Sequence, residues 1–587
     1  MAAEALVAAV LLALIVSLAR ELVSPAAGML GALVVFVLLG LLPVEDAFVG
    51  FSSPATISIA GLYVVSRAMR DRCRLDVVAN RVLGEHPDGE RAVLLRLLPP
   101  IAAVSGVFNN TPLVATTGPV VRGWAERKGI AATHLLMPLS FAAILGGVLT
   151  LIGTGPNLVV AGMVAAAGHE PLGFFTLTPV TLPMALVGLA MIVLLAPRVL
   201  PDRRTPHERS ASERRDYALR LEVEPGGPLE GRTLAEAGLR ELDDAYVAKV
   251  VRDAELLDAT PARRLQGGDL LLLVGNARAV PELLRRPGLA EAERAQTVDL
   301  EHAGTLVEVI VGANSRLVGS TLKRAAFRGR YGGAVIAIHR ADHWIESKLG
   351  TVELRAGDAL LVLADEAFVD RWQGDRDFAL VIPHGDGTSS TDGAWAQRLT
   401  LGVFGVMVVM AASGLVPVAT AIIGACAVLV ATRLISFPRA VDSLDLGILL
   451  IVASAIGIAR VVETSGLAAT AAGWIELAAA IGGPLVALLT LVLVTLLLTE
   501  LVTNVAAAAL VLPIGFDVAA RTGLDVQGVA VAVAVAASAS FLTPIGYQTN
   551  TIVYGLGGYR FADYWRLGLP LTALTVVAVV GGVTLWW

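Results

Sequence analysis

The chain is poor in charged residues and almost free of cysteine. Asp, Glu, Lys and Arg make up 16% of its 587 residues, whereas about a quarter is usual in soluble globular proteins. Its two cysteines, Cys73 and Cys426, lie far apart and fit neither a disulfide framework nor the ligand spacing of a metal cluster. Hydrophobic residues make up 55%. We therefore expect a protein that is not wholly soluble and has no transition-metal site.

Several motifs with specific chemistry are also missing. The sequence has no Gly-x-x-x-x-Gly-Lys-Ser/Thr, which argues against pumping driven directly by ATP, and no Gly-x-Gly-x-x-Gly after a strand. Gly-x-Ser-x-Gly and His-Glu-x-x-His are absent as well. The net charge is −6 without a dense basic stripe, which argues against nucleic acid as a partner. These absences favour a protein that is not an enzyme.

The charge that is present is concentrated in one segment. Residues from about 198 to 398 are rich in Arg, Asp and Glu, whereas the flanks contain long runs without any charge. Runs of this kind are typical of membrane-spanning helices. We predict one membrane repeat over residues 1–200, a second over 398–587, and a soluble insert between them.

The insert is itself duplicated. Gly268-Asp269 precedes one short apolar strand and Gly357-Asp358 precedes another, 89 residues later. Residues 228–234 and 316–322 resemble each other at nearly the same offset. The pattern predicts two small α/β domains, over residues 216–290 and 300–375.

Four short polar breaks interrupt the apolar flanks in matching order. The breaks are residues 108–112 and 151–157 in the first half, and residues 499–504 and 543–550 in the second. Asn110 and Asn157 are 47 residues apart, and Asn504 and Asn550 are 46 apart. Paired interruptions in two halves point to the binding site of a transporter.

The residue types in these breaks suit ion binding. A broken helix offers backbone N–H groups to an anion and carbonyl oxygens to Na⁺. Ser105 and Thr499 stand five residues before Asn110 and Asn504, so we expect each hydroxyl to face its break and each Asn to touch both ion and substrate. The alternative is that these residues only cap helices or join neighbouring helices. Glu500 is either a functional group or a hydrogen-bond partner of freed backbone.

The placement of Arg and Lys predicts the orientation in the membrane. Arg20, the cluster Arg67 to Arg74 and residues 200–397 are expected on the cytoplasmic side, which inverts the second half relative to the first. The apolar span 55–65 should end before this cluster. His134 and His169 lie near membrane ends, where we expect solvated or interfacial side chains.

The breaks resemble the signatures of the divalent anion:sodium symporter family. The resemblance rests on Asn109-Asn110-Thr111-Pro112 with residues 153–157, and on Thr503-Asn504 with residues 541–550. The insert resembles a tandem of TrkA-C domains (the C-terminal domain of regulators of potassium conductance), as in a sulfate-transporter-like branch of that family. The second half has Val505 where the family has Thr, and Gly155-Pro156 stands where this branch has Ser-Thr.

The resemblance implies the fold and the activity. It implies an α-helical polytopic membrane protein with two inverted repeats containing re-entrant hairpins and broken helices, plus a soluble α/β insert of two TrkA-C-like domains. It further implies a homodimer in the cytoplasmic membrane that carries a small divalent anion with Na⁺ by an elevator-type movement. Sulfate is the first expectation and a dicarboxylate the second.

The site residues follow by position. The expected sodium ligands are Ser105, Asn110, Gly153, Thr154 and Asn157 in the first half, and Thr499, Asn504, Thr543, Gly546 and Asn550 in the second. The expected substrate contacts are Asn109, Asn110, Thr111, Pro156, Thr503, Asn504, Thr543 and Pro544.

Two alternatives stay open. The TrkA-C-like pair either binds a nucleotide or ion that regulates transport or only supports the dimer. A channel or anion exporter gated by these domains is a further possibility, although a Gly-Tyr-Gly filter is absent.

Overall fold

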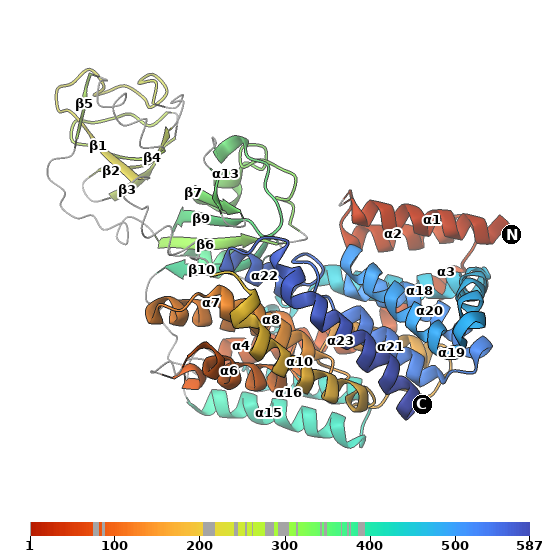
Figure 1. Cartoon of the computed structure of the whole chain (residues 1–587). Coiled ribbons are helices and arrows are strands. Elements are labelled where there is room, and N and C mark those ends of the chain that lie inside the picture. Colours follow the sequence, from red (N-terminus) through yellow and green to blue (C-terminus); the bar gives the residue numbers. More distant parts are fainter. Residues whose placement is uncertain are drawn as a thin grey trace. The chain divides into compact units, whose positions relative to one another are not determined.

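The computed structural model describes residues 2–20, 22–73, 81–84, 89–202, 218–239, 245–252, 255–260, 262–275, 287–291, 305–312, 315–340, 343–345, 349–365, 367–372, 375, 377–384 and 394–587. The chain divides into two compact units. One is helical and contains residues 1–202, 390–553 and 560–587, and the other contains residues 203–389 with 554–559. Their elements are labelled in Figure 1.

The helical unit is built from both ends of the chain. Its first part comprises α1 (Ala2–Ala19), α2 (Pro25–Leu38), α3 (Val44–Ala47), α4 (Pro54–Arg72), α6 (Glu90–Ser105), α7 (Asn110–Lys128), α8 (Thr133–Gly147), α9 (Gly155–Ala166) and α10 (Thr178–Val199), with a 3₁₀ turn at Val49–Ser52. Its second part comprises α15 (Ala394–Ser413), α16 (Val418–Ala431), α17 (Phe437–Asp442), α18 (Leu446–Thr464), α19 (Leu467–Leu501), α20 (Asn504–Thr522), α21 (Val526–Ser538), α22 (Gln548–Gly557) and α23 (Asp563–Trp586).

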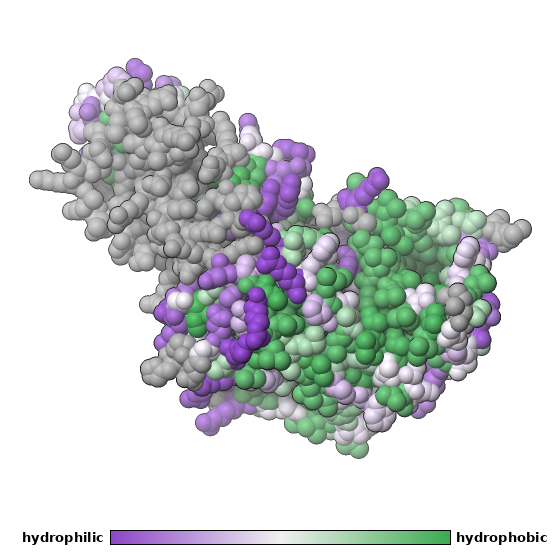
Figure 2. All heavy atoms as spheres, viewed as in Figure 1, coloured by the Kyte–Doolittle hydropathy of each residue, from purple (hydrophilic) through white to green (hydrophobic). Residues whose placement is uncertain are grey.

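Six helices among the described residues are long and apolar enough to cross a membrane. They are Thr178–Val199, Trp395–Ser413, Leu446–Thr464, Gly482–Leu501, Asn504–Thr522 and Asp563–Trp586. Large apolar side chains lie exposed on the helices, with Leu38 at 80% and Leu585 at 84% exposure, and Figure 2 shows hydrophobic residues over much of this unit's visible surface. Such a surface is stable in contact with lipid, because the same apolar area would be exposed to solvent in water.

The helices next to the predicted breaks begin and end alike in the two halves. Asn109 caps α7 by accepting from the Thr111 N–H, and Thr503 caps α20 by accepting from the Ala506 N–H. Both helices span 19 residues and end at a glycine with positive φ, Gly129 and Gly523. Side-chain oxygens at the N-cap satisfy backbone donors that a helix start leaves open, and glycine adopts the left-handed end without steric cost.

Helix α4 contains the expected apolar span 55–65 and continues through the basic residues to Arg72, with Arg67 paired to Asp71 one turn later. One expectation about local structure is wrong. His134 is buried: its ring lies 2.9 Å from Glu90 Oε1 and 3.1 Å from the Leu200 carbonyl. These partners replace the water that a solvated histidine would contact.

The described residues of the second unit form two antiparallel five-stranded sheets with the same topology. The strands of the first are β1 (Ala218–Val223), β2 (Ala245–Arg252), β3 (Glu255–Asp258), β4 (Leu270–Gly275) and β5 (Leu289–Glu291). The strands of the second are β6 (Thr305–Val311), β7 (Gly333–Arg340), β8 (His343–Trp344), β9 (Ala359–Ala364) and β10 (Phe378–His384), with helices α13 (Phe327–Tyr331) and α14 (Ala367–Trp372). The orders β3-β2-β4-β1-β5 and β8-β7-β9-β6-β10 correspond strand by strand.

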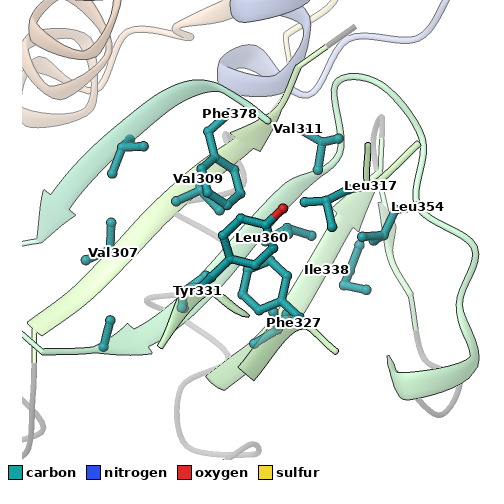
Figure 3. Close-up of a cluster of buried hydrophobic side chains, with 14 of the residues drawn as sticks. Val307, Val309, Val311, Leu317, Phe327, Tyr331, Ile338, Leu354, Leu360 and Phe378 are labelled. Carbon is teal, nitrogen blue, oxygen red and sulfur yellow. The ribbon is translucent and has the colours of Figure 1, made fainter. Parts of the chain in front are cut away.

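Each sheet repeats the same buried ion pair. Asp269 precedes β4 and accepts from Arg252, and Asp358 precedes β9 and accepts from Arg340. The Gly-Asp motifs of the sequence therefore hold matching arginines, which satisfies both buried carboxylates. Figure 3 shows the apolar core of the second sheet, where Tyr331 and Phe327 pack on Val309 and Phe378.

We predict that Asp377→Ala destabilises the second sheet. The buried Asp377 carboxylate accepts from Arg316 and from the Tyr331 hydroxyl at 2.7 Å. Burial alone would raise the pKa of Asp377, but the bonds from Arg316 and Tyr331 hold it at about 2. This contribution to stability is thus present above pH 4 and is lost as the pH falls toward 2. The variant leaves the Tyr331 hydroxyl unpaired, at a cost of about 1–3 kcal/mol.

Limited proteolysis of the full chain in detergent at pH 7 measures this effect. We expect faster cleavage within residues 305–384 of the variant. The control is Asp365→Ala, because the pair of Asp365 with Arg371 is exposed and such pairs contribute about 0–1 kcal/mol. Equal cleavage rates in the two variants would contradict the prediction.

Candidate substrate and cation site

The first half holds a hydroxyl and an asparagine together at its first break. The Ser105 hydroxyl, at the end of α6, contacts the Oδ1 atom of Asn110 at the start of α7 and donates to the Ala143 carbonyl of α8 at 2.8 Å. Ser105 is fully buried and Asn110 is 1% exposed. The amide of Asn110 is thereby fixed in orientation, with its oxygen toward Ser105.

The second half repeats this arrangement 394 residues later. The Thr499 hydroxyl in α19 contacts the Asn504 Oδ1 atom at 3.1 Å and donates to the Ala537 carbonyl of α21 at 2.5 Å. Thr499 is fully buried and Asn504 is 7% exposed. The hydroxyl and the asparagine that the sequence pairs in each half are thus in contact in both.

The other two predicted asparagines each hold a loop together. The Asn157 amide nitrogen donates to the carbonyls of Gly147 and Thr150 at 3.4 and 2.8 Å. The Asn550 amide nitrogen donates to those of Ser540 and Thr543 at 2.9 and 3.2 Å. Both asparagines are fully buried. Their bonds satisfy carbonyls at or just after the ends of α8 and α21 and in the loops that follow these helices.

The breaks of the two halves meet. The Asn110 amide nitrogen donates to the Tyr547 hydroxyl at 2.9 Å, and that hydroxyl also bonds Thr154 Oγ1 at 2.8 Å. The Thr111 hydroxyl donates to Gln548 Oε1 at 3.1 Å. Val505 lies beside Gly155, since a Cβ built there would come within 3.4 Å of it. Residues from the two ends of the chain therefore form one polar site within the helical unit.

Backbone carbonyl oxygens crowd around Gly153. A Cβ built on this glycine would lie 2.3 Å from the Gly147 oxygen, 2.9 Å from that of Ser105 and 3.0 Å from that of Gly106. Unwound carbonyls of this kind are the Na⁺ ligands that discontinuous helices offer. The donor set is neutral oxygen, which fits Na⁺ and gives no reason to expect a transition metal.

The matching place in the second half is lined by side-chain oxygens. A Cβ built on Gly546 would lie 2.1 Å from Ser540 Oγ, 2.8 Å from Glu500 Oε2 and 3.0 Å from Thr543 Oγ1. The Glu500 carboxylate accepts from the Leu542 N–H at 3.0 Å and from the Thr543 hydroxyl at 2.6 Å. Of the two possibilities for Glu500, these contacts are those of a partner of freed backbone, placed beside the predicted cation ligands.

Two buried amide atoms at the site have no hydrogen-bond partner among the described residues. They are Asn157 Oδ1, an acceptor, and Asn504 Nδ2, a donor. An unpaired buried polar atom costs about 1–3 kcal/mol, so ligands are their natural partners. The acceptor suits a cation, and the donor suits an anion.

Four of the predicted substrate contacts make structural contacts at the breaks. The side chains of Asn109 and Thr503 serve as helix caps, and Pro156 lies in the first turn of α9, where its missing N–H is tolerated. The Pro544 carbonyl accepts from Thr551 at 2.9 Å. These contacts give each of the four residues a structural role at a break, and their contact with the substrate stays a prediction.

The structure also brings in residues that the sequence did not single out. The side chains of Tyr547 and Gln548 accept hydrogen bonds from Asn110 and Thr111 of the first half. Ser140 of α8 donates to Asn550 Oδ1 at 2.7 Å. Tyr547 lies within the fourth break, so its position was a usable signal. Ser140 lies inside a buried helix without a pattern to mark it.

Comparison with known families places the chain. Residues 10–536 match the family model CitMHS, described as citrate transporter. The chain belongs to this citrate transporter family. An uncharacterized transporter from Synechocystis sp. is 31% identical over 561 residues, covering 93% of this chain and 91% of that protein. A probable sodium/sulfate cotransporter 3 from Chlamydomonas reinhardtii is 23% identical over 750 residues, covering 92% and 83%.

Membership in the citrate transporter family supports a transporter rather than an enzyme, integral to a membrane and acting on anions. It agrees with the class of symporters that the sequence resembles. The match spans the two sheets but does not show that they are TrkA-C domains, so this identity stays a prediction.

Proposed function

We propose that this citrate transporter family member carries a small divalent anion together with Na⁺, with sulfate as its substrate. The observation that carries the proposal is the meeting of the four breaks, with one unpaired donor and one unpaired acceptor buried among them. An anion and its coupling cations bind there as neighbours. The nearby opposite charges offset the cost of placing each ion at membrane depth.

Two cation sites follow from the repeated contacts. Ser105, Asn110 and Asn157, with Thr154 and the carbonyls around Gly153, form the first. Thr499, Asn504, Thr543, Gly546 and Asn550 form the second. Asn110 and Asn504 bridge cation and substrate, since each oxygen faces a hydroxyl of the cation site while each nitrogen is directed elsewhere. The anion lies between them.

The remaining features of the proposal come from the family resemblance. The two halves are inverted repeats, and transport proceeds by an elevator-type movement in a homodimer of the cytoplasmic membrane. The sheets of the second unit are TrkA-C-like domains on the cytoplasmic side, which bind a nucleotide or ion or support the dimer.

A carboxylate substrate is the second candidate, favoured by the description of the matching family as citrate transporter. Uptake of radiolabelled sulfate and succinate into proteoliposomes separates the two. We expect sulfate uptake that requires external Na⁺ and is not inhibited by excess succinate. Succinate uptake that sulfate does not inhibit would assign the protein to dicarboxylates instead.

A further inference from the structure

One of the matched positions at which the two halves of the site differ carries a tyrosine in the second half. Residues Gly153-Thr154-Gly155-Pro156-Asn157 correspond to Gly546-Tyr547-Gln548-Thr549-Asn550, with glycine first and asparagine last in both. The two asparagines make equivalent bonds to their loops. Tyr547 therefore stands where the first half has Thr154, and adds an aromatic ring to one half only.

The ring places its hydroxyl in the opposite half. Tyr547 contacts Asn110 at 2.9 Å and Thr154 at 2.8 Å, which are the asparagine and the hydroxyl of the first half's breaks. Asn110 is thereby engaged on both sides, its oxygen by Ser105 and its nitrogen by Tyr547. The tyrosine takes one of the two N–H donors of this amide, and only the second remains for the substrate.

The second half lacks an equivalent of this contact. The Asn504 nitrogen has no partner among the described residues, although the residue is only 7% exposed. Its neighbour Val505 has no hydroxyl, unlike Thr111 at the matched position, and lies against Gly155. Of the two matched asparagines, the one whose nitrogen has no partner among the described residues is thus that of the second half.

We propose that Tyr547 is a specificity-determining residue that restricts the site to a compact tetrahedral dianion. A dicarboxylate presents two anionic groups several bonds apart and needs donors in both halves. The ring of Tyr547, held by the bonds of its hydroxyl to Asn110 and Thr154, fills the space at the first of these positions, which leaves room for one compact anion beside the unpaired Asn504 nitrogen. Sulfate fits in that space. The inference rests on the proposed function and names the feature that selects its substrate.

The test is the substitution Tyr547→Thr, which copies the residue of the first half. It removes the ring and frees the Asn110 nitrogen. We expect the ratio of kcat/KM for sulfate to that for succinate to fall at least about tenfold, the lower limit for a change of pocket size by a few carbon atoms. Both substrates are measured as initial rates into proteoliposomes under a Na⁺ gradient. A ratio within twofold of the wild type would overturn the proposal.

Tyr547→Phe separates the ring from the hydroxyl and tests the proposal even where the threonine variant does not fold. With the ring kept, the preference for sulfate over succinate should persist. The KM for sulfate should change about 2- to 10-fold, because the ring loses the hydrogen bonds of its hydroxyl to Asn110 and Thr154. Succinate uptake by this variant that equals its sulfate uptake would contradict the role of the ring.

The control is Thr490→Val. The Thr490 hydroxyl in α19 donates to the Val486 carbonyl of its own helix at 2.7 Å, so its removal should leave both rates unchanged. Failure of the proposed function gives a different result. A wild-type protein that transports neither anion with Na⁺ removes the transport assignment, whereas Na⁺-driven uptake with an unaltered ratio in Tyr547→Thr removes only the role of Tyr547.

Discussion

Asn504→Ala is expected to lower Na⁺-driven anion uptake by at least about 100-fold. The substitution removes the unpaired Nδ2 donor proposed for the anion and the Oδ1 acceptor that faces Thr499. A hydrogen bond to a charged group contributes about 1.5–3 kcal/mol. The variant loses one such interaction with the anion and one with Na⁺, so the two fold-decreases in uptake multiply. Asn110→Ala should act similarly, because Asn110 occupies the matched position in the first half.

The measurement is the initial rate of uptake into proteoliposomes, with the amount of folded protein determined by size-exclusion chromatography in detergent. The matched control is Gln527→Ala, another amide, in the first turn of α21. It should retain wild-type uptake. Normal transport by either asparagine variant would show that its amide is not needed to bind the ions, and would contradict the proposal that Asn110 and Asn504 bridge cation and substrate.

Gly153→Ala is expected to weaken the activation of uptake by Na⁺. The new methyl group would lie 2.3 Å from the Gly147 carbonyl oxygen and within 3.0 Å of those of Ser105 and Gly106. Backbone atoms cannot move aside as a flexible side chain can, so the loop must shift and the carbonyls separate. We expect the Na⁺ concentration for half-maximal uptake to rise at least about tenfold, as for a lost ligand to a charged group.

The control for this variant is Gly424→Ala in α16, where a Cβ meets no atom within 4 Å. It also gains a methyl group in an apolar helix and should keep the wild-type response to Na⁺. A Gly153→Ala protein that responds to Na⁺ as the control does would show that the carbonyls around Gly153 bind no coupling ion.

Much of the site was predictable because polar residues stand out in apolar runs. Asn110 and Asn504 each follow a hydroxyl by five residues, and the structure places each pair in contact. The internal duplication made this signal specific. A single break would be equally consistent with a helix cap, and the side chains of Asn109 and Thr503 are in fact caps.

The rest depends on contacts between segments distant in sequence. Tyr547 reaches Asn110 across 437 residues, and no local pattern states which half a side chain enters. His134 was expected near solvent from its place at a helix end, but Glu90 and Leu200 surround it. The carbonyls that converge on Gly153 are backbone atoms, which every residue has, so composition and motifs cannot reveal them.

Coupled transport of an anion by this citrate transporter family member is tested most directly by accumulation. Proteoliposomes containing the full chain are given a trace of labelled sulfate and an inward Na⁺ gradient, and an ionophore later dissipates that gradient. We predict that internal sulfate rises above its external concentration and falls back after the ionophore is added. Sulfate that only equilibrates across the membrane, at a rate independent of Na⁺, would contradict symport.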